Sequence, residues 1–357
     1  MAEKEQKPKK LMTPKRATRT FTAKATITLF AILIISVFLM PLAYMSVTAF
    51  KTLHQITDIN AHFLPKSPEY FVYEGEEYPL YQVPTEDGET HVWALYRKGR
   101  EDSDWIDPNN IEAGPIFWEG RWRVLEPAYE FDPTFDNFPN AWNQVNFKRL
   151  FRNTFIIAMA STFGTLISSI AVAYGFARFR IPGVNIIFMV LIATIILPSQ
   201  VTLIPQYIFF RQIGWGGTWW PLIIPHFFAN AYNVFLLRQY FRGIPKDLDE
   251  AAMMDGASPL RVLVSVIIPQ SWPVITAVSM FHFFWAWNDF FTPLVYLQGR
   301  EDLYPISVGL TQFNNIYAVQ PGLAMAAAIM AVALPVVIFF SAQKVFMQGI
   351  VITGVDK

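Results

Sequence analysis

Long stretches without charged side chains constrain the fold of this 357-residue chain most strongly. About 20 predominantly apolar residues span the hydrocarbon core of a bilayer, at roughly 1.5 Å per helical residue. Such a stretch must be helical, because a helix satisfies all its own backbone polar groups. The sequence therefore predicts an all-α polytopic membrane protein with six transmembrane helices, at residues 27–50, 153–177, 184–210, 219–240, 273–291 and 323–346.

The composition supports a membrane protein and excludes several other classes. The chain is 53% hydrophobic, with a mean hydropathy of +0.29. Its formal net charge is +0, so no bulk electrostatic field favours a nucleic-acid partner. It has no cysteine, which excludes disulfides and thiolate metal sites, and its five histidines are scattered. We expect no metal and no cofactor bound by this chain.

The distribution of basic residues predicts the orientation. Residues 1–25 carry eight basic side chains against two acidic ones, and further arginines flank short loops at Arg178, Arg180, Arg238 and Arg242. Loops rich in Lys and Arg stay in the cytoplasm. We therefore predict a cytoplasmic basic tail (1–25), a first helix (26–50), an outer insertion (51–150), a core of five helices (151–346) and a cytoplasmic tail (347–357), with both termini inside.

The predicted outer insertion differs in character from the rest of the chain. Residues 51–150 contain 18 acidic and 9 basic residues. Short alternating segments at 91–97 and 115–125, separated by turn residues, predict strands. We expect a small β-rich module between the first and second helices. Its Trp and Tyr side chains could form the core of the module or stack on sugar rings, and the sequence leaves both readings open.

The polar loop at residues 243–270 carries several helix-end signals. Pro245 suits the first turn of a helix, where the N–H that it lacks is not needed. The helix dipole favours negative charge in that turn, which holds Asp247, Asp249 and Glu250. Gly256 can adopt a positive φ and end this helix. Ser258 and Pro259 then start another one. We predict a short helix, a sharp turn and a second helix.

This loop carries a family resemblance. Glu250-Ala251-Ala252, followed by Asp255-Gly256 and by Ile268-Pro269, resembles the EAA loop in inner-membrane permease subunits of type I, binding-protein-dependent ABC importers. The run at residues 287–290 resembles carbohydrate-uptake members, nearest to the maltose-type second permease. The alternative is an ordinary amphipathic helix-turn-helix. By the resemblance, a coupling helix docks on an ATPase subunit through Leu248, Glu250, Ala251, Ala252, Asp255, Gly256 and Pro269.

The resemblance also implies the assembly. Such importers sit in the bacterial or archaeal plasma membrane and pair two permeases, usually different, with two ATPase subunits and an extracytoplasmic solute-binding protein. ATP is then bound by the partner ATPase, and the spans alternate between inward-open and outward-open states. Glu250 would meet a basic group on the ATPase, Gly256 would permit the turn, and the two alanines would allow close docking.

Neutral polar residues within the spans are the candidates for the translocation pathway, because they suit an uncharged hydroxylated solute. An alternative is that they form hydrogen bonds between helices. These residues are His226, Asn230, Asn233, Ser279, His282 and Asn288.

Other function classes fit the sequence less well. The chain has no Gly-Lys dipeptide, which the phosphate-binding loop of an ATPase requires, and no metalloprotease or serine-hydrolase motif. We therefore expect a transporter subunit and not an enzyme. An ion-coupled secondary carrier would need acidic groups within the spans, where almost no charge is found. A membrane sensor or assembly protein with an outer domain would not need the loop at 243–270.

Overall fold

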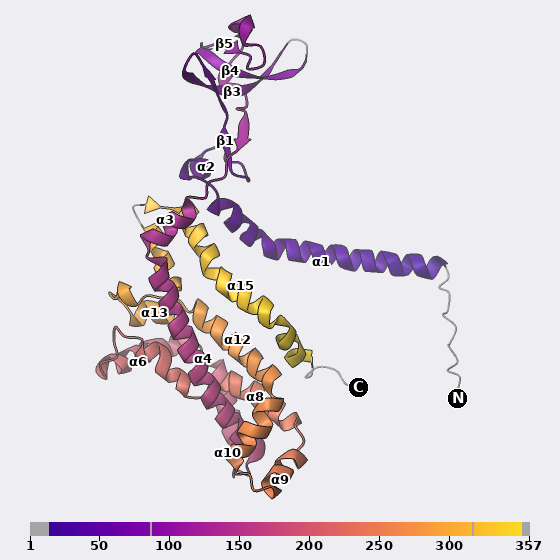
Figure 1. The fold of residues 1–357 in the computed structure, drawn as a ribbon, viewed down its shortest axis with the longest axis vertical. Helices are drawn as coiled ribbons and strands as arrows, with labels where there is room; N and C mark the ends of the chain where they lie inside the picture. Colours follow the sequence, from indigo (N-terminus) through magenta and orange to yellow (C-terminus); the bar gives the residue numbers. More distant parts are fainter. Residues whose placement is uncertain (1–13, 86–87, 316–317, 352–357) are drawn as a thin grey trace. The chain divides into compact units, whose positions relative to one another are not determined.

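The computed structural model describes residues 14–85, 88–315 and 318–351. The chain divides into two compact units, residues 1–134 and 135–357 (Figure 1). Within the described residues, three helices are long and apolar enough to cross a membrane, at Thr22–Ala49, Phe147–Arg178 and Pro321–Lys344. The number becomes five if each of two sharply bent helix pairs forms one span.

The first unit begins with a long apolar helix. Helix α1 covers Pro14–Ala49, so part of the predicted basic tail is helical; residues 1–13 lie outside the described part. A short helix α2 (Leu53–Thr57) follows and begins with a capping box between Thr52 and Gln55. The Gln55 amide donates to Ser67 Oγ at 2.8 Å and to the Asp132 carbonyl at 2.9 Å. These bonds fix α2 to the base of the β-structure that follows.

A small antiparallel sheet forms the rest of this unit. Its five strands pair in sequence order, and a separate two-stranded ribbon, β1 with β7, lies at its base. The β2–β3 hairpin turns through Glu74 and Gly75, both at positive φ, as a two-residue hairpin loop requires. The strands are β1 (Lys66–Pro68), β2 (Tyr70–Tyr73), β3 (Glu76–Pro84), β4 (Thr90–Lys98), β5 (Asp102–Ile106), β6 (Ile116–Glu119) and β7 (Tyr129–Phe131).

Aromatic side chains pack on one face of this sheet. Trp93 and Trp105 are buried, and Trp118 and Trp122 cover them. The indole N–H of Trp122 donates to the Gly99 carbonyl at 3.1 Å. Two of the four tryptophans are therefore core residues of a domain too small to form a large core. Stacking on sugar rings by the outer aromatic side chains remains an untested prediction.

The second unit is helical and is built around α4 (Phe147–Arg178), which runs along it from α3 to the end that carries α9 (Figure 1). Helix α4 packs mainly against α8 and α12, and α12 packs against α15. The remaining helices are α3 (Asn137–Gln144), α5 (Val184–Ala193), α6 (Ser199–Gln212), α7 (Trp220–Ile223), α8 (Ala231–Gly243), α9 (Asp247–Met254), α10 (Pro259–Val262), α11 (Ile268–Gln270), α12 (Trp272–Asn288), α13 (Phe291–Tyr296), α14 (Ile306–Gly309) and α15 (Pro321–Val351).

Short 3₁₀ or π turns and one small hairpin join these helices. They are η3 (Thr194–Ile196), η4 (Ile224–Phe227), the π turn η5 (Leu263–Ile267), η6 (Glu301–Leu303), η7 (Leu310–Phe313), and the strands β8 (Asn314–Asn315) and β9 (Ala318–Val319). In the first unit, η1 (Ile111–Ala113) and η2 (Trp122–Val124) flank β6.

Two predicted spans are not continuous helices. The third is divided into α5 and α6, which meet at 98° next to Pro198. The fourth consists of α7, η4 and α8, with Pro221 and Pro225 inside its first half. Proline removes a helix hydrogen bond and bends or ends the helix. The second unit is thus a set of packed helices, some of them broken at prolines, whereas the number of spans stays a prediction.

Close packing at Gly164 joins α4 to η4. A Cβ atom at Gly164 would lie 2.5 Å from Cδ2 of Phe227, whereas one at Gly175 would meet only Phe179, at 4.0 Å. We expect Gly164→Ala to destabilise the protein by about 1–3 kcal/mol, because the ring must move. Gly175→Ala should leave stability unchanged or raise it, since alanine favours a helix. Melting temperatures of the two variants in the same detergent compare them, and an equal or higher value for Gly164→Ala would contradict the packing argument.

Candidate functional site

The loop after α8 forms the predicted short helix, α9. Its first turn holds the three acids, and the amides of Asp249 and Glu250 both donate to the Lys246 carbonyl. Pro245 was predicted to lie in this first turn, but it lies just before the N-cap residue Lys246. The proline thus stops α8 from continuing and leaves the first turn of α9 to residues that favour it.

Gly256 ends α9 through a double hydrogen-bond motif. Its φ is +82°, its N–H donates to the Met253 carbonyl, and the Ala257 N–H donates to the Ala252 carbonyl. This pair of bonds is the Schellman arrangement that closes many helices. No atom lies within 4 Å of a Cβ placed on Gly256, so only the backbone conformation demands glycine there.

The second helix starts as the sequence predicts and then changes its winding. The Ser258 hydroxyl accepts from the Arg261 N–H, and Pro259 is the first helical residue. Pro269 follows the π turn η5 at the start of α11. A proline there removes one helix hydrogen bond, and a wider turn accommodates the loss. An 83° bend then leads into α12.

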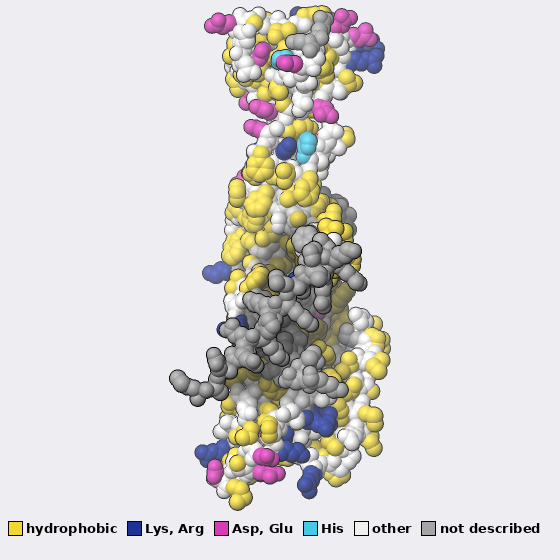
Figure 2. Space-filling model, turned by 90° about the vertical axis from the view of Figure 1, so that its right-hand side faces the viewer, with side chains coloured by type: hydrophobic (Ala, Val, Ile, Leu, Met, Phe, Trp, Pro, Cys, Tyr) yellow, Lys and Arg dark blue, Asp and Glu magenta, His cyan; other side chains and the backbone are white. Residues whose placement is uncertain are grey.

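Most side chains of α9 face outward. Leu248, Glu250, Ala251 and Asp255 are exposed, Ala252 is half-buried, and Met254 is 88% exposed. Helix α9 lies at the end of the helical unit (Figure 1), where charged side chains gather below a hydrophobic surface (Figure 2). Together, Leu248, Met253, Met254 and Leu260 present an apolar surface with acids beside it. Exposed apolar residues of this kind are typical of a protein contact site.

One acid of α9 behaves differently from the others. Asp249 is buried, and its Oδ2 lies 2.6 Å from Nε of Arg178, the last residue of α4. Their side chains are only 9% and 5% exposed. Arg178 Nη2 also donates to the Ile244 carbonyl at 3.0 Å. In the sequence, Arg178 is only an orientation signal and Asp249 only a helix-dipole charge, so their pairing was not predicted.

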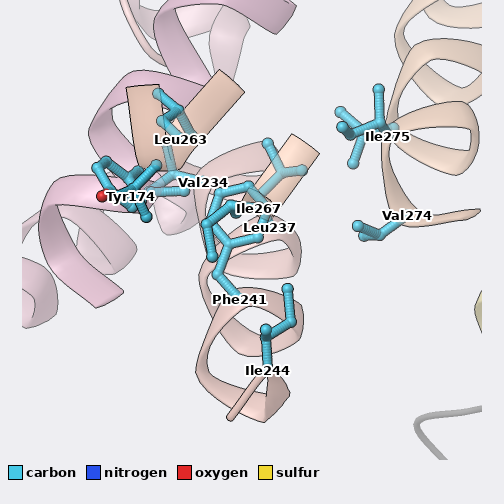
Figure 3. Close-up of a cluster of buried hydrophobic side chains, with 12 residues drawn as sticks. Tyr174, Val234, Leu237, Phe241, Ile244, Leu263, Ile267, Val274 and Ile275 are labelled. Atoms are coloured by element: carbon cyan, nitrogen blue, oxygen red, sulfur yellow. The ribbon is translucent and has the colours of Figure 1, made fainter. Parts of the chain in front are cut away.

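A hydrophobic cluster supports this end of the unit. Figure 3 shows side chains from α4, α8 and η5 packed around Leu237, Phe241 and Ile267, all of which are fully buried. Ala252 of α9 packs against the same cluster. The exposed helix therefore rests on a packed base, which restricts its movement relative to α4.

Four of the six predicted pathway residues surround one cavity of about 290 Å³. His226, Asn230, Asn233 and His282 line it together with Tyr232, Phe281 and Trp285. The rings of His226 and His282 meet edge to face, with their centroids 4.8 Å apart. Nε2 of His282 is buried and has no hydrogen-bond partner among the described residues. The Asn230 side chain caps α8 by accepting from the Asn233 N–H.

The other two predicted pathway residues do not line this cavity. The Ser279 hydroxyl donates to the Ile275 carbonyl at 2.6 Å, and the Asn288 amide donates to the Phe284 carbonyl at 2.8 Å. Both bonds are made within α12. Among the residues that the structure describes, no group of three His, Cys, Asp or Glu side chains could hold a metal ion.

Comparison with known proteins gives the family. A family model described as "Binding-protein-dependent transport system inner membrane component" matches residues 164–351. The osmoprotective compounds uptake permease protein of Synechocystis sp. is 31% identical over 267 residues, 74% of this chain and 88% of that protein. The diacetylchitobiose uptake system permease protein of Streptomyces coelicolor is 30% identical over 62% of this chain and 73% of that protein.

A solved structure supports the fold. One chain in the crystal structure of a bacterial ABC transporter involved in the import of the acidic polysaccharide alginate matches with a TM-score of 0.63 at 18% identity. The match covers 94% of this chain and 99% of that one, so it extends from the helical core into the first unit. With just over half of the chain matched by the family model, the protein belongs to the inner membrane components of binding-protein-dependent transport systems, as a multi-pass permease subunit and not an enzyme.

Proposed function

We propose that this chain is one of two permease subunits, in a heterodimer, of an ATP-driven carbohydrate importer. The observation that carries this proposal is α9, an exposed helix with acids in its first turn and a glycine-closed end, resting on a packed base. Glu250, Ala251, Ala252, Asp255, Gly256 and Leu248 would contact the ATPase, and Pro269 would shape the turn behind them. Six spans, cytoplasmic termini and an outer position for residues 51–150 belong to the same proposal.

Two features support a sugar as the solute. The cavity beside α8 and α12 combines aromatic rings with neutral polar groups, which suit the faces and hydroxyls of a sugar. Relatives include permeases named for diacetylchitobiose and alpha-glucoside uptake. His226, Asn230, Asn233 and His282 would contact the passing solute. Ser279 and Asn288 would stabilise α12 instead.

The arrangement of acids favours ATP coupling over ion coupling. Asp249 is buried, but it lies in the loop after α8 and is neutralised by Arg178. Asp289, just after α12, accepts from the Thr292 N–H in the first turn of α13 at 3.3 Å. Asp249 thus lies outside the predicted spans and is paired, and Asp289 lies at the end of its helix, whereas ion-coupled carriers usually hold their acidic groups near the middle of the membrane.

A matched pair of asparagine variants tests the pathway. Asn233 lines the cavity and is 4% exposed, whereas Asn288 is exposed and bonds only to its own helix. We expect Asn233→Leu to lower uptake of a radiolabelled disaccharide about tenfold in proteoliposomes that contain the whole complex, because each lost hydrogen bond costs about 0.5–1.5 kcal/mol. Asn288→Leu should transport normally. Equal uptake by both variants would remove the cavity from the pathway.

A further inference from the structure

Two residues on one face of α4 hold both ends of the loop that carries α9. Arg178 donates to the carbonyl of Ile244, before α9, and the Tyr174 hydroxyl donates to the carbonyl of Pro259, after it, at 3.1 Å. Tyr174 and Arg178 are four residues apart, so they lie one turn apart on the same face. Between these two bonds, Arg178 also contacts Asp249. The loop that carries α9 is thus attached to α4 at three points, one of which, Asp249, lies on α9 itself.

The Arg178–Asp249 pair is the deepest of these attachments. Asp249 is the only buried residue of α9, so the helix has no apolar side chain inserted far into the unit. A buried ion pair contributes little net stability, because desolvation offsets the attraction between its charges. Arg178 and Asp249 are nevertheless held next to each other, since a charge that leaves the pair becomes buried and alone. Such a pair is better suited to orient a helix than to stabilise a fold.

Helix α4 in turn contacts one residue of the cavity wall and the opposite end of the unit. Its Ser168 hydroxyl contacts the carbonyl of His226, which lines the cavity, at 3.3 Å. Further along α4, the Asn153 amide donates to the carbonyls of Asp302 and Tyr304 at 2.9 and 3.0 Å. An unbroken helix of 32 residues, roughly 48 Å long, joins these contacts to Arg178.

We propose that the Arg178–Asp249 pair makes α9 a rigid extension of α4, so that movement of α9 reaches the cavity through α4. Arg178 and Asp249 are positioning residues in this role, since they contact neither the solute nor a reacting atom. The inference rests on the proposed function, in which an ATPase moves α9. It adds the route by which that movement enters the permease.

The ratio of ATP hydrolysed to solute transported tests this role, because a purely structural defect lowers both rates together. We expect the Asp249→Asn complex to retain its ATPase subunits and to hydrolyse ATP within about twofold of the unmodified rate. Uptake should fall about tenfold or more, within the range of 5–150-fold that coupling between sites commonly spans. The matched control is Asp247→Asn, the same change in the same turn at an exposed position, which should keep the normal ratio.

A second measurement follows the attachment directly. Because the chain has no cysteine, Arg180→Cys and Lys246→Cys can carry a pair of spin labels at exposed positions. The distance distribution between the labels should be narrow in the otherwise unmodified complex, should broaden with Asp249→Asn, and should stay narrow with Asp247→Asn. An unchanged distribution together with an unchanged ATP-to-solute ratio in Asp249→Asn would overturn the inference.

A double variant separates orientation from charge compensation if Asp249→Asn folds poorly. Arg178→Met with Asp249→Leu leaves no buried charge unpaired, and such apolar replacements are often neutral for stability. We expect this variant to assemble but to keep the raised ATP-to-solute ratio, because it also lacks the bond to Ile244. A normal ratio would mean that the pair only neutralises charge. If the chain without any substitution did not co-purify with an ATPase subunit, the proposed function would be contradicted instead.

Discussion

Glu250→Lys should abolish ATP-driven uptake while the protein still inserts and folds. Glu250 is exposed in the first turn of α9. Reversing its charge there costs only about 0.3–1 kcal/mol through the helix dipole, too little to unfold the unit. At a docking surface that supplies a basic group, the same reversal places like charges together and costs several kcal/mol. We expect uptake to fall about 100-fold or more, measured in proteoliposomes and compared with the amount of protein in the membrane.

Asp247→Lys is the matched control for that variant. Asp247 is an exposed acid of the same turn but lies outside the Glu-Ala-Ala run, so it shares the dipole cost and not the proposed contact. Co-purification should recover the ATPase with Asp247→Lys and lose most of it with Glu250→Lys. If the two variants bound the ATPase and transported equally well, Glu250 would have no special role in docking.

The local geometry of the loop after α8 could be predicted from the sequence because short-range effects determine it. Acids favour a helix start, Gly256 supplies a positive φ, and Ser258 followed by Pro259 favours the start of a helix. The structure contains each of these features at the predicted residue. Only Pro245 differs, and it lies two residues before α9.

The Arg178–Asp249 pair could not be predicted in this way. Asp247, Asp249 and Glu250 are equivalent as local charges, and only the tertiary position of α4 makes one of them buried. The spacing of α9 gives a weak signal, because Asp249 and Ala252 are three residues apart and share the inward face. A single sequence does not reveal which arginine meets that face.

The six predicted pathway residues also divide into two groups, those that bond to their own helix and those that line the cavity. A polar side chain in a span can bond to its own helix, as Ser279 and Asn288 do. It can also line a cavity, as His226 and His282 do. Polarity alone selects all of them. The fourth span was predicted as one helix at 219–240 and is broken in the structure; Pro221 and Pro225 are the sequence signal for that break, which the prediction did not use.

Gly256→Val should uncouple transport with little change in global stability. Valine at φ +82° brings its Cβ too close to the backbone, at a cost of about 1–2 kcal/mol or more for a β-branched side chain. Relief of that strain breaks the two hydrogen bonds that end α9 and redirects α10. We expect uptake to fall about 10- to 100-fold, while the melting temperature hardly changes because α9 is largely exposed.

Gly243→Val is the control, because a Cβ there also meets no atom within 4 Å and the backbone φ is not positive. It should transport normally. The variant Gly256→Asn should fall between the two, since asparagine tolerates the left-handed conformation better than other side chains. If Gly256→Val and Gly256→Asn lowered uptake equally, the side-chain bulk at the docking surface would matter, and not the backbone strain. The size of the added group and the strain it causes are separable here, because the open space around Gly256 leaves the backbone conformation as the only local demand.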